Sequence, residues 1–264
     1  WLFLANDTNR SVDLFTGRVT LSEEQIKSWV SFSKELSIYS RKTKFLYIIS
    51  NSKEKVFPEY YPFDIADKSL TEVVESIFIE NQVEHINPQS ILRKNKFSYY
   101  KTDTHWSDLG AYIAYKEVLN KTDNIDYIEK PEFTDVEVIG DLGSKLSPRE
   151  RSIKKKFENG LLTEPNIVFD NKLSKTGAIK VLINNEVTNN KTVLIFGGSS
   201  MENFFPYFSY SFRRVITINL PGSVVDEIVD FEKPDLLLMQ NNERYLINPG
   251  KVFKTFYDSP LSKA

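Results

Sequence analysis

The sequence contains no cysteine among its 264 residues. Disulfide bonds, thiolate metal sites and cysteine nucleophiles are therefore excluded. Histidine is almost as scarce, with only His85 and His105 present. A reaction that needs an imidazole as its base must use one of these two residues.

An excess of one charge is also missing. The 34 Lys and Arg residues and the 36 Asp and Glu residues leave a formal net charge of −2. No nucleic-acid partner is expected, because the chain lacks the basic field that nucleic acid or an anionic membrane would attract. No apolar run approaches the roughly 20 residues of a membrane-spanning helix. Hydrophobic residues make up 41% and charged residues 27%, a composition typical of a globular protein with a full core.

Short apolar runs alternate with helical patterns along the chain. Strands are predicted at 1–5, 44–49, 84–88, 193–196, 214–219 and 234–239. Helices are predicted at 21–39, 71–79, 107–119 and 224–229, the first with a Ser22 and Gln25 capping box and the third with Ser107 as its N-cap. This alternation predicts an α/β fold with a mostly parallel sheet flanked by helices.

We expect one domain over 1–264 with a small insertion at roughly 129–190. Within the insertion, 133–139 alternates like a half-buried strand, and 166–169 and 180–183 fit the strands of a hairpin. The charged segment 147–159 is interpreted as a solvated surface segment.

The stretch from Thr192 to Phe208 holds a serine where a nucleophile is commonly presented. An apolar strand is followed by Gly197-Gly198, then by Ser199 and Ser200, and then by a segment predicted as a helix at 201–205. A tight turn between a strand and a helix lifts a hydroxyl clear of the sheet edge, and the helix start supplies free N–H groups. The alternative is an ordinary turn in which one serine caps the helix.

Asp103-Thr-His-Trp106 supplies the other groups that a serine nucleophile needs. The imidazole of His105 can act as the base, and the Asp103 carboxylate can reach back to orient it. His85 has no motif around it and is interpreted as a strand or loop residue. A metal site at Asp103 and His105 would need further ligands, and no other His or Cys lies nearby.

Together these motifs resemble those of the SGNH hydrolase-like acetyltransferases of the alginate type, the AlgX and AlgJ group. Further segments of the sequence resemble the same family, namely Trp1-Leu-Phe-Leu4, Ser50-Asn-Ser-Lys53, 56–62, Gly140-Asp-Leu142 and 242–246. The resemblance spans about residues 1–246. Its Asp-Thr-His-Trp motif is fairly specific, whereas the Gly-x-Ser turn alone is not.

This resemblance implies an SGNH-hydrolase-like (flavodoxin-like) fold with a circularly permuted motif order, in which Asp-x-His precedes the serine. It implies Ser199 as the nucleophile, His105 as the base and Asp103 as the orienting acid. Family members transfer an acetyl group to a polysaccharide hydroxyl through an acetyl-Ser intermediate. The implied partners are a polysaccharide or oligosaccharide acceptor and an acetyl donor supplied by a membrane O-acyltransferase. No cofactor or metal is expected.

The serine turn departs from the family pattern Gly-Asp-Ser-Phe, because Gly198 stands in place of the Asp. A glycine there leaves the turn looser or lets the backbone come nearer a ligand. The change also leaves Ser200 as a rival nucleophile. Ser199 is favoured because it holds the aligned position.

Candidates for binding the oxyanion are the Ser199 N–H and Asn242, with Asn241 second, because 234–243 resembles the segment that supplies the Gly-x-Asn donor of ordinary SGNH esterases. The alternative is that both Asn residues cap a following helix. Trp106 either shapes the acyl pocket or stacks on a sugar ring, or it belongs to the core.

Two other functions stay open at this stage. One is a carbohydrate acetylesterase, and the other is a non-catalytic glycan-binding module whose catalysis was lost with the Gly198 change.

The chain begins at Trp1 without a leader, which suggests an excised domain or mature form. The family resemblance implies a periplasmic or cell-envelope protein. A cytoplasmic domain of a larger glycan-assembly enzyme is the alternative.

Overall fold

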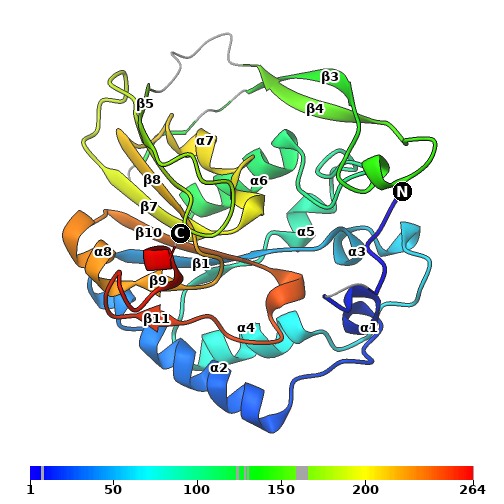
Figure 1. Cartoon of the computed structure of the whole chain (residues 1–264), viewed down its shortest axis with the longest axis horizontal. Coiled ribbons are helices and arrows are strands. Elements are labelled where there is room, and N and C mark those ends of the chain that lie inside the picture. The colour runs from blue at the N-terminus through cyan, green and yellow to red at the C-terminus, as the bar shows by residue number, and fades with distance from the viewer. Residues whose placement is uncertain (7–8, 123–124, 128, 130, 159–165, 264) are drawn as a thin grey trace.

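The computed structural model describes residues 1–6, 9–122, 125–127, 129, 131–158 and 166–263. A seven-stranded sheet runs through the middle of the molecule (Figure 1). Its order is β2 (His85–Ile86), β1 (Lys44–Ser50), β10 (Leu236–Asn242), β7 (Thr192–Gly197), β8 (Arg214–Asn219), β6 (Ile179–Ile183) and β5 (Asn166–Asp170). The strands from β2 to β8 are parallel, and β6 and β5 continue the sheet in antiparallel pairing. The predicted α/β fold with a mostly parallel central sheet is confirmed.

Helices cover both faces of this sheet (Figure 1). The α-helices are α1 (Ser11–Phe15), α2 (Glu23–Leu36), α3 (Lys53–Val56), α4 (Leu70–Glu80), α5 (Gln89–Leu92), α6 (Asp108–Leu119), α7 (Phe205–Phe208) and α8 (Asp226–Glu232). The predicted capping box of Ser22 and Gln25 starts α2, and Ser107 caps α6 by accepting a hydrogen bond from Gly110 N. No helix among the described residues is both long and apolar enough to cross a bilayer.

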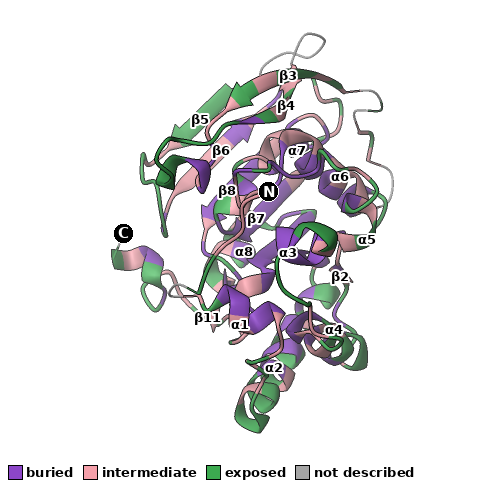
Figure 2. Ribbon diagram, turned by 90° about the vertical axis from the view of Figure 1, so that its right-hand side faces the viewer, coloured by how far each residue is buried: buried purple, intermediate pink, exposed green. Residues whose placement is uncertain are grey.

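The buried strands send alternate side chains to two hydrophobic clusters, as the period of a strand requires. On one face, Leu46, Ile195 and Leu238 pack with α6 residues such as Ala114 and Tyr115. On the other, the adjacent strand residues pack with helices α2, α4 and α8. Figure 2 shows this burial along the sheet, while the outer side of α2 is exposed. The sheet is therefore the middle layer of three.

The region predicted as an insertion contributes directly to the sheet. The predicted hairpin strands are β5 and β6, and β6 pairs with β8. The charged segment predicted as solvated surface has residues 147–151 exposed. Within it, 152–158 is strand β4 (Ser152–Glu158), which pairs with β3 (Glu132–Val138). In β4, Phe157 packs against the core, Lys154 pairs with Asp108 of α6, and Lys156 is exposed. Residues 130 and 159–165 of the predicted insertion lie outside the described residues.

Two other predicted elements differ from the structure. Residues 1–5 form no strand, although Leu2 N donates a hydrogen bond to Lys101 O. Segment 224–229 is split, because β9 (Val224–Val225) pairs with β11 (Val252–Phe253) before α8 begins at Asp226. The β-branched Val224-Val225 pair favours the extended conformation at this point.

We expect Phe78→Ala to lower the free energy of unfolding by about 3–5 kcal/mol, since it removes a buried ring and leaves a cavity. Phe78 is 0% exposed and packs against Trp29 and Tyr47. The matched control is Phe231→Ala, because Phe231 is 81% exposed and its loss should change stability by no more than about 0.5 kcal/mol. Urea unfolding followed by circular dichroism measures both. Equal losses in the two variants would contradict this assignment of the core.

Candidate active site

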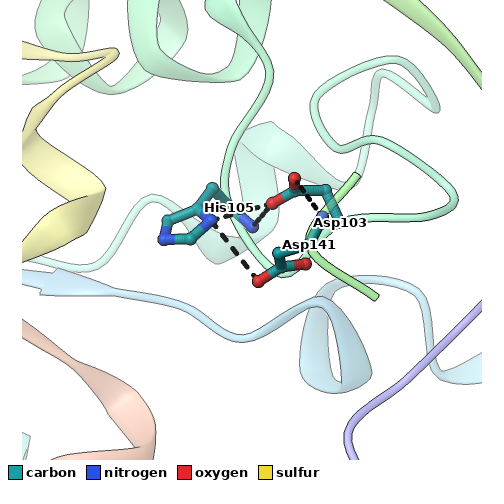
Figure 3. Close-up of side chains that lie close together, drawn as sticks. All are labelled: Asp103, His105 and Asp141. Carbon is teal, nitrogen blue, oxygen red and sulfur yellow. Dashed lines mark hydrogen bonds and ion pairs between the residues drawn. The ribbon is translucent and has the colours of Figure 1, made fainter. Parts of the chain in front are cut away.

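A chain of hydrogen bonds joins Asp103, His105 and Ser199. The Nδ1 atom of His105 lies 2.8 Å from Asp103 Oδ1, and its Nε2 atom lies 3.0 Å from Ser199 Oγ. Figure 3 shows the imidazole lying beside the two carboxylates of Asp103 and Asp141. Because a carboxylate accepts hydrogen bonds, it favours the tautomer with hydrogen on Nδ1, which leaves the Nε2 lone pair facing the serine hydroxyl. The arrangement can therefore remove a proton from Ser199.

The sheet presents Ser199 at the carboxyl end of β7. Strand β7 ends at Gly197, and the predicted helix 201–205 is instead a 3-10 helix over Ser199–Met201 followed by α7. A Cβ on Gly197 would lie 2.5 Å from Met201 Sδ, so a larger residue would require the Met201 side chain to move where the 3-10 helix folds back against the strand. This turn places the Ser199 side chain on the surface while its backbone stays at the sheet edge.

Gly198 is held in place rather than loose. Its N–H donates a 2.7 Å hydrogen bond to the buried Gln240 Oε1. Its φ of −103° is accessible to any residue, and a Cβ there would lie 3.3 Å from Pro221. The sequence predicted a looser turn or a closer approach to a ligand, and the structure adds a hydrogen bond to Gln240 that holds the backbone at this position.

The loop that carries Asp103 and His105 is fixed by its neighbours. Both backbone N–H groups that reach Asp103 donate to its carboxylate, His105 N to Oδ1 at 2.8 Å and Asp141 N to Oδ2 at 2.9 Å. A Cβ on Gly140 would lie 2.2 Å from Thr102 O, so only glycine lets the 140–143 turn approach this closely. Asn203 joins this loop to the serine segment, since its Nδ2 donates to Trp106 O at 3.0 Å.

Asp141 is a second carboxylate beside the imidazole, and sequence reasoning gave it no role. Its Oδ2 lies 3.8 Å from His105 Nδ1, and it accepts hydrogen bonds from Thr104 N and Thr104 Oγ1 at 2.8 and 2.5 Å. The sequence did contain a signal for it, because the Gly140-Asp-Leu142 segment resembles a segment of the same family. That resemblance did not indicate that Asp141 would lie beside His105.

The electrostatics follow from these contacts. Burial alone would raise the pKa of Asp103, but hydrogen bonds from the His105 side chain, His105 N and Asp141 N lower this pKa to about 2. The hydrogen bond to Asp103 raises the pKa of His105 in spite of burial, and the charges of Asp103 and Asp141 add to the effect. The site thus holds an ionised carboxylate that stabilises an imidazolium.

Asp103, His105 and Asp141 also bring potential metal-ligand atoms within 4.8 Å of one another. Each carboxylate oxygen of Asp103 and Asp141 accepts a hydrogen bond, either from the loop that carries His105 or from the 140–143 turn. Because His105 Nε2 lies 3.0 Å from Ser199 Oγ, we interpret the cluster as a proton-transfer network.

A ladder of buried polar side chains lies beneath the serine turn. Gln240 Nε2 donates to Ser50 Oγ at 2.7 Å and to Asn242 Oδ1 at 2.9 Å, and Ser200 Oγ donates to Asn242 Oδ1 at 2.7 Å. The Ser200 hydroxyl is thereby engaged away from His105. Ser199 is the serine that the structure brings to the imidazole.

The remaining predicted site residues occupy different positions, and not all of them lie at the site. Asn242 Oδ1 is occupied by two donors, and within the described part of the chain its Nδ2 has no acceptor. Asn241 lies on the opposite face of β10, against Gly222, and is not brought to the site. Trp106 is 2% exposed and packs on Phe204, so it belongs to the core rather than to a pocket wall.

A cavity of about 340 Å³ opens beside the Ser199 hydroxyl. It is lined by Tyr100, Asp103, His105, Val138, Ile139, Gly140, Lys154, Ser199, Glu202 and Asn203. The lining is mixed in polarity and comes partly from the β3–β4 hairpin. A polar molecule can therefore reach the serine and the imidazole together.

Comparison with known proteins gives structural but not sequence matches. No protein-family model and no curated protein matches the sequence. Bacillus cereus PatB1 matches in structure with a TM-score of 0.64 at 15% identity, over 86% of this chain and 92% of PatB1. A DHHW family protein from Eubacterium siraeum matches with a TM-score of 0.59 at 14% identity, over 84% and 86%. The O-acetyltransferase domain of Pseudomonas putida AlgJ matches with a TM-score of 0.54 at 15% identity, over 84% and 83%.

The chain shares its fold with these proteins. Identities this low establish the likeness of the fold, and the chemistry of this chain has to be argued from its own side chains. The fold nevertheless agrees with the resemblance to the AlgJ group that the sequence motifs carried, and it extends over most of the chain and of each of the three matched structures.

We expect the pKa of the His105 imidazole to lie above its ordinary value of about 6.5. Asp103→Asn should lower this pKa, because the carboxylate that stabilises the imidazolium is removed. Proton NMR titration of the ring resonances measures it, and His85→Gln assigns the two histidines. An unchanged His105 pKa in Asp103→Asn would show that the pair is not coupled in solution.

Proposed function

We propose that this protein is a serine-dependent O-acetyltransferase that acts on hydroxyl groups of a bacterial cell-surface or exported polysaccharide. The observation that carries the proposal is the continuous hydrogen-bonded chain from Asp103 through His105 to Ser199, which ends at an open cavity. Its three members occupy the roles of orienting acid, base and nucleophile in serine acyl transfer.

The first half-reaction loads the serine. The Ser199 oxygen attacks the carbonyl carbon of an acetyl ester or thioester, and His105 Nε2 takes the hydroxyl proton. The tetrahedral intermediate collapses, the bond to the leaving group breaks, and His105 returns the proton to that group. Asp103 keeps the imidazole oriented and stabilises its positive charge.

The second half-reaction repeats these steps with a sugar hydroxyl. His105 removes the proton of the acceptor hydroxyl, whose oxygen attacks the acetyl carbon. The ester bond to Ser199 breaks, and the serine oxygen recovers the proton from His105. The acetyl group ends on the glycan and the protein returns to its starting state.

Two donors are suited to the oxyanion of both intermediates. The Ser199 backbone N–H begins the 3-10 helix and has no acceptor among the described residues. The Asn242 side-chain amide is aligned by the two hydrogen bonds to its oxygen, which leaves its NH₂ group available. A preorganised pair of this kind stabilises charge that develops in the transition state.

The comparisons support the proposal at the level of fold. The AlgJ domain is an O-acetyltransferase, and PatB1 has also been solved with a sulfonyl adduct at a TM-score of 0.64 and 16% identity. We assign the chain to the SGNH type with permuted motif order on the basis of its own motifs. The proposed acceptor is a polysaccharide or oligosaccharide, the acetyl donor is supplied by a membrane O-acyltransferase, and the site of action is the periplasm or cell envelope.

Acetylester hydrolysis is the second candidate, favoured by the exposure of Ser199 beside an open cavity that also admits water. The glycan-binding module was motivated by the Gly198 change and the aromatic content. The bond that holds Gly198 and the hydrogen-bonded chain from Asp103 to Ser199 favour a catalytic protein instead. Comparing acetate release with acetyl transfer to added oligosaccharides separates esterase from transferase.

We expect Ser199→Ala to reduce turnover of p-nitrophenyl acetate at least about 10³-fold, since the nucleophile is lost. Ser200→Ala is the matched control and should stay within about tenfold of the wild type, because it removes only a donor to Asn242. Mass spectrometry of the loaded protein should find the acetyl group on Ser199. Full activity of Ser199→Ala would overturn the assignment.

Asn242→Ala should reduce the same turnover by about 10²–10³-fold, the effect of removing one oxyanion donor. Asn241→Ala is the control on the opposite face of β10, and its rate should remain near that of the wild type at temperatures where both variants are folded. Similar losses in both variants would remove Asn242 from the oxyanion site and point to a general disturbance of β10.

A further inference from the structure

We infer that Lys53 is a positioning residue for the proposed acetyl transfer, that its ammonium group holds the loop bearing Asp103 and His105, and that loss of its proton releases this loop at alkaline pH. The inference rests on the proposed function for its kinetic readout. Its structural readout does not depend on catalysis.

The ammonium of Lys53 is bonded to three backbone carbonyls of one loop. Its Nζ donates to Asp103 O at 2.6 Å and to Tyr100 O and Lys101 O at 3.2 Å each. An ammonium has three N–H donors, so its hydrogen-bonding capacity is filled. Lys53 itself is only 2% exposed. One buried side chain from the start of α3 thus fixes the backbone at Asp103, two residues before His105.

Aromatic rings close the other side of this cage. The Lys53 Nζ lies 5.8 Å from the centroid of Trp1 and 5.2 Å from that of Phe3. Trp1 in turn packs on Phe57 and Tyr60 at centroid distances of 5.0 and 4.8 Å. The ring faces attract the cation without competing for its three N–H donors. Residues 1–3 therefore take part in supporting the loop although they form no strand.

Loss of a proton changes what Lys53 can bond. A neutral amine has two N–H donors and a lone pair, so at least one of the three carbonyls would lose its donor and face that lone pair. Burial lowers the pKa of Lys53 to about 8, while the carboxylates of Glu54, Asp103 and Asp141 oppose this change. Glu54 is its neighbour in α3, and Asp103 and Asp141 act on it from the loop that it bonds and from the 140–143 turn.

The carbonyl of Asp103 belongs to the residue that orients the imidazole. A backbone shift there moves the carboxylate and, through the 2.8 Å contact, His105 Nδ1. Misplacement of a reacting group by about 1 Å can cost on the order of 100-fold in rate. Binding of the acceptor in the cavity depends on other residues, so the effect is expected in kcat more than in KM.

The pH dependence of stability has the opposite sign to that of activity. Because the pKa of Lys53 is lower in the folded state than in the unfolded chain, the unfolded chain binds more protons between about pH 8 and about pH 10.4. Titration of this group therefore makes the fold more stable as pH rises through that range. A loss of activity there without a loss of melting temperature is the signature of a released loop, not of unfolding.

The experiment compares wild type, Lys53→Met and the control Lys42→Met from pH 6.5 to 10, with acetylation of the serine by p-nitrophenyl acetate as the readout. Lys42 forms an ion pair with Asp230, and both side chains are largely exposed. Wild type and Lys42→Met should lose at least about tenfold in kcat/KM with a midpoint near pH 8, where Lys53 loses its proton. Lys53→Met should be slow and flat across this range, at the level that the wild type reaches at high pH.

The NMR signals of the two histidines supply a readout without catalysis. The titration curve of the His105 ring should show a second inflection near pH 8, and this inflection should be missing in Lys53→Met. His85 contacts Glu75 on another edge of the sheet, so its curve should show no such inflection in either protein. A wild type without the alkaline inflection, or a Lys53→Met variant that keeps it, would overturn the inference. Ser199→Ala decides the proposed function separately, so the two failures can be told apart.

Discussion

The hydrogen bond between Ser199 and His105 joins residues that are 94 positions apart, and everything proposed for this protein depends on its 3.0 Å length. Each partner has its own support. The serine is held by the end of β7 and by the bond from Gly198 N to Gln240, whereas the imidazole is carried by a loop outside the sheet. Lys53, the first residue of α3 just after β1, holds that loop by hydrogen bonds to three of its backbone carbonyls. Because parallel strands end at one edge, the supports of both partners start from the same edge of the sheet.

Holding the two partners in place requires charged groups in the protein interior. Lys53, Glu54 and Glu243 are all buried near this edge. Burial raises the pKa of Glu243 to about 7, although its carboxylate accepts hydrogen bonds from Ser52 N at 2.8 Å and from the Thr71 hydroxyl at 2.6 Å. Buried charges weaken a fold unless they are paired with donors or acceptors. Hydrogen bonds are directional, however, and apolar packing is not. We interpret these residues as the means by which the fold gains a fixed geometry at the cost of some stability.

Most of the sheet could be predicted from the sequence, because each central strand is a short apolar run that must be buried on both faces. The helices α2 and α6 were equally accessible, since a serine cap and the helical period coincide in each. Segments whose partners are distant were harder to predict. Residues 152–158 carry so many lysines that they resemble solvated surface, and only their pairing with β3 shows that they form a strand. Residues 1–5 have the pattern of a strand, but their aromatic rings are used by Lys53 instead of by a neighbouring strand.

The same contrast between local patterns and contacts with distant segments explains which parts of the site could be predicted from the sequence. Asp103 and His105 share one loop, so their approach is a local matter, and the strand-to-turn pattern placed Ser199 at the correct edge. The choice between Asn241 and Asn242 depends on the phase of β10, which is fixed by packing on the two clusters. Since Leu236 and Leu238 face α6, Asn242 continues on that face and Asn241 does not.

Gly198 posed a similar problem, because its effect on the serine turn depends on Gln240, which is 42 positions away in the sequence. A substitution at a turn weakens it only when no other residue holds the backbone. Here a buried amide holds it, which makes the Gly-Gly-Ser-Ser form of the turn compatible with a rigid nucleophile.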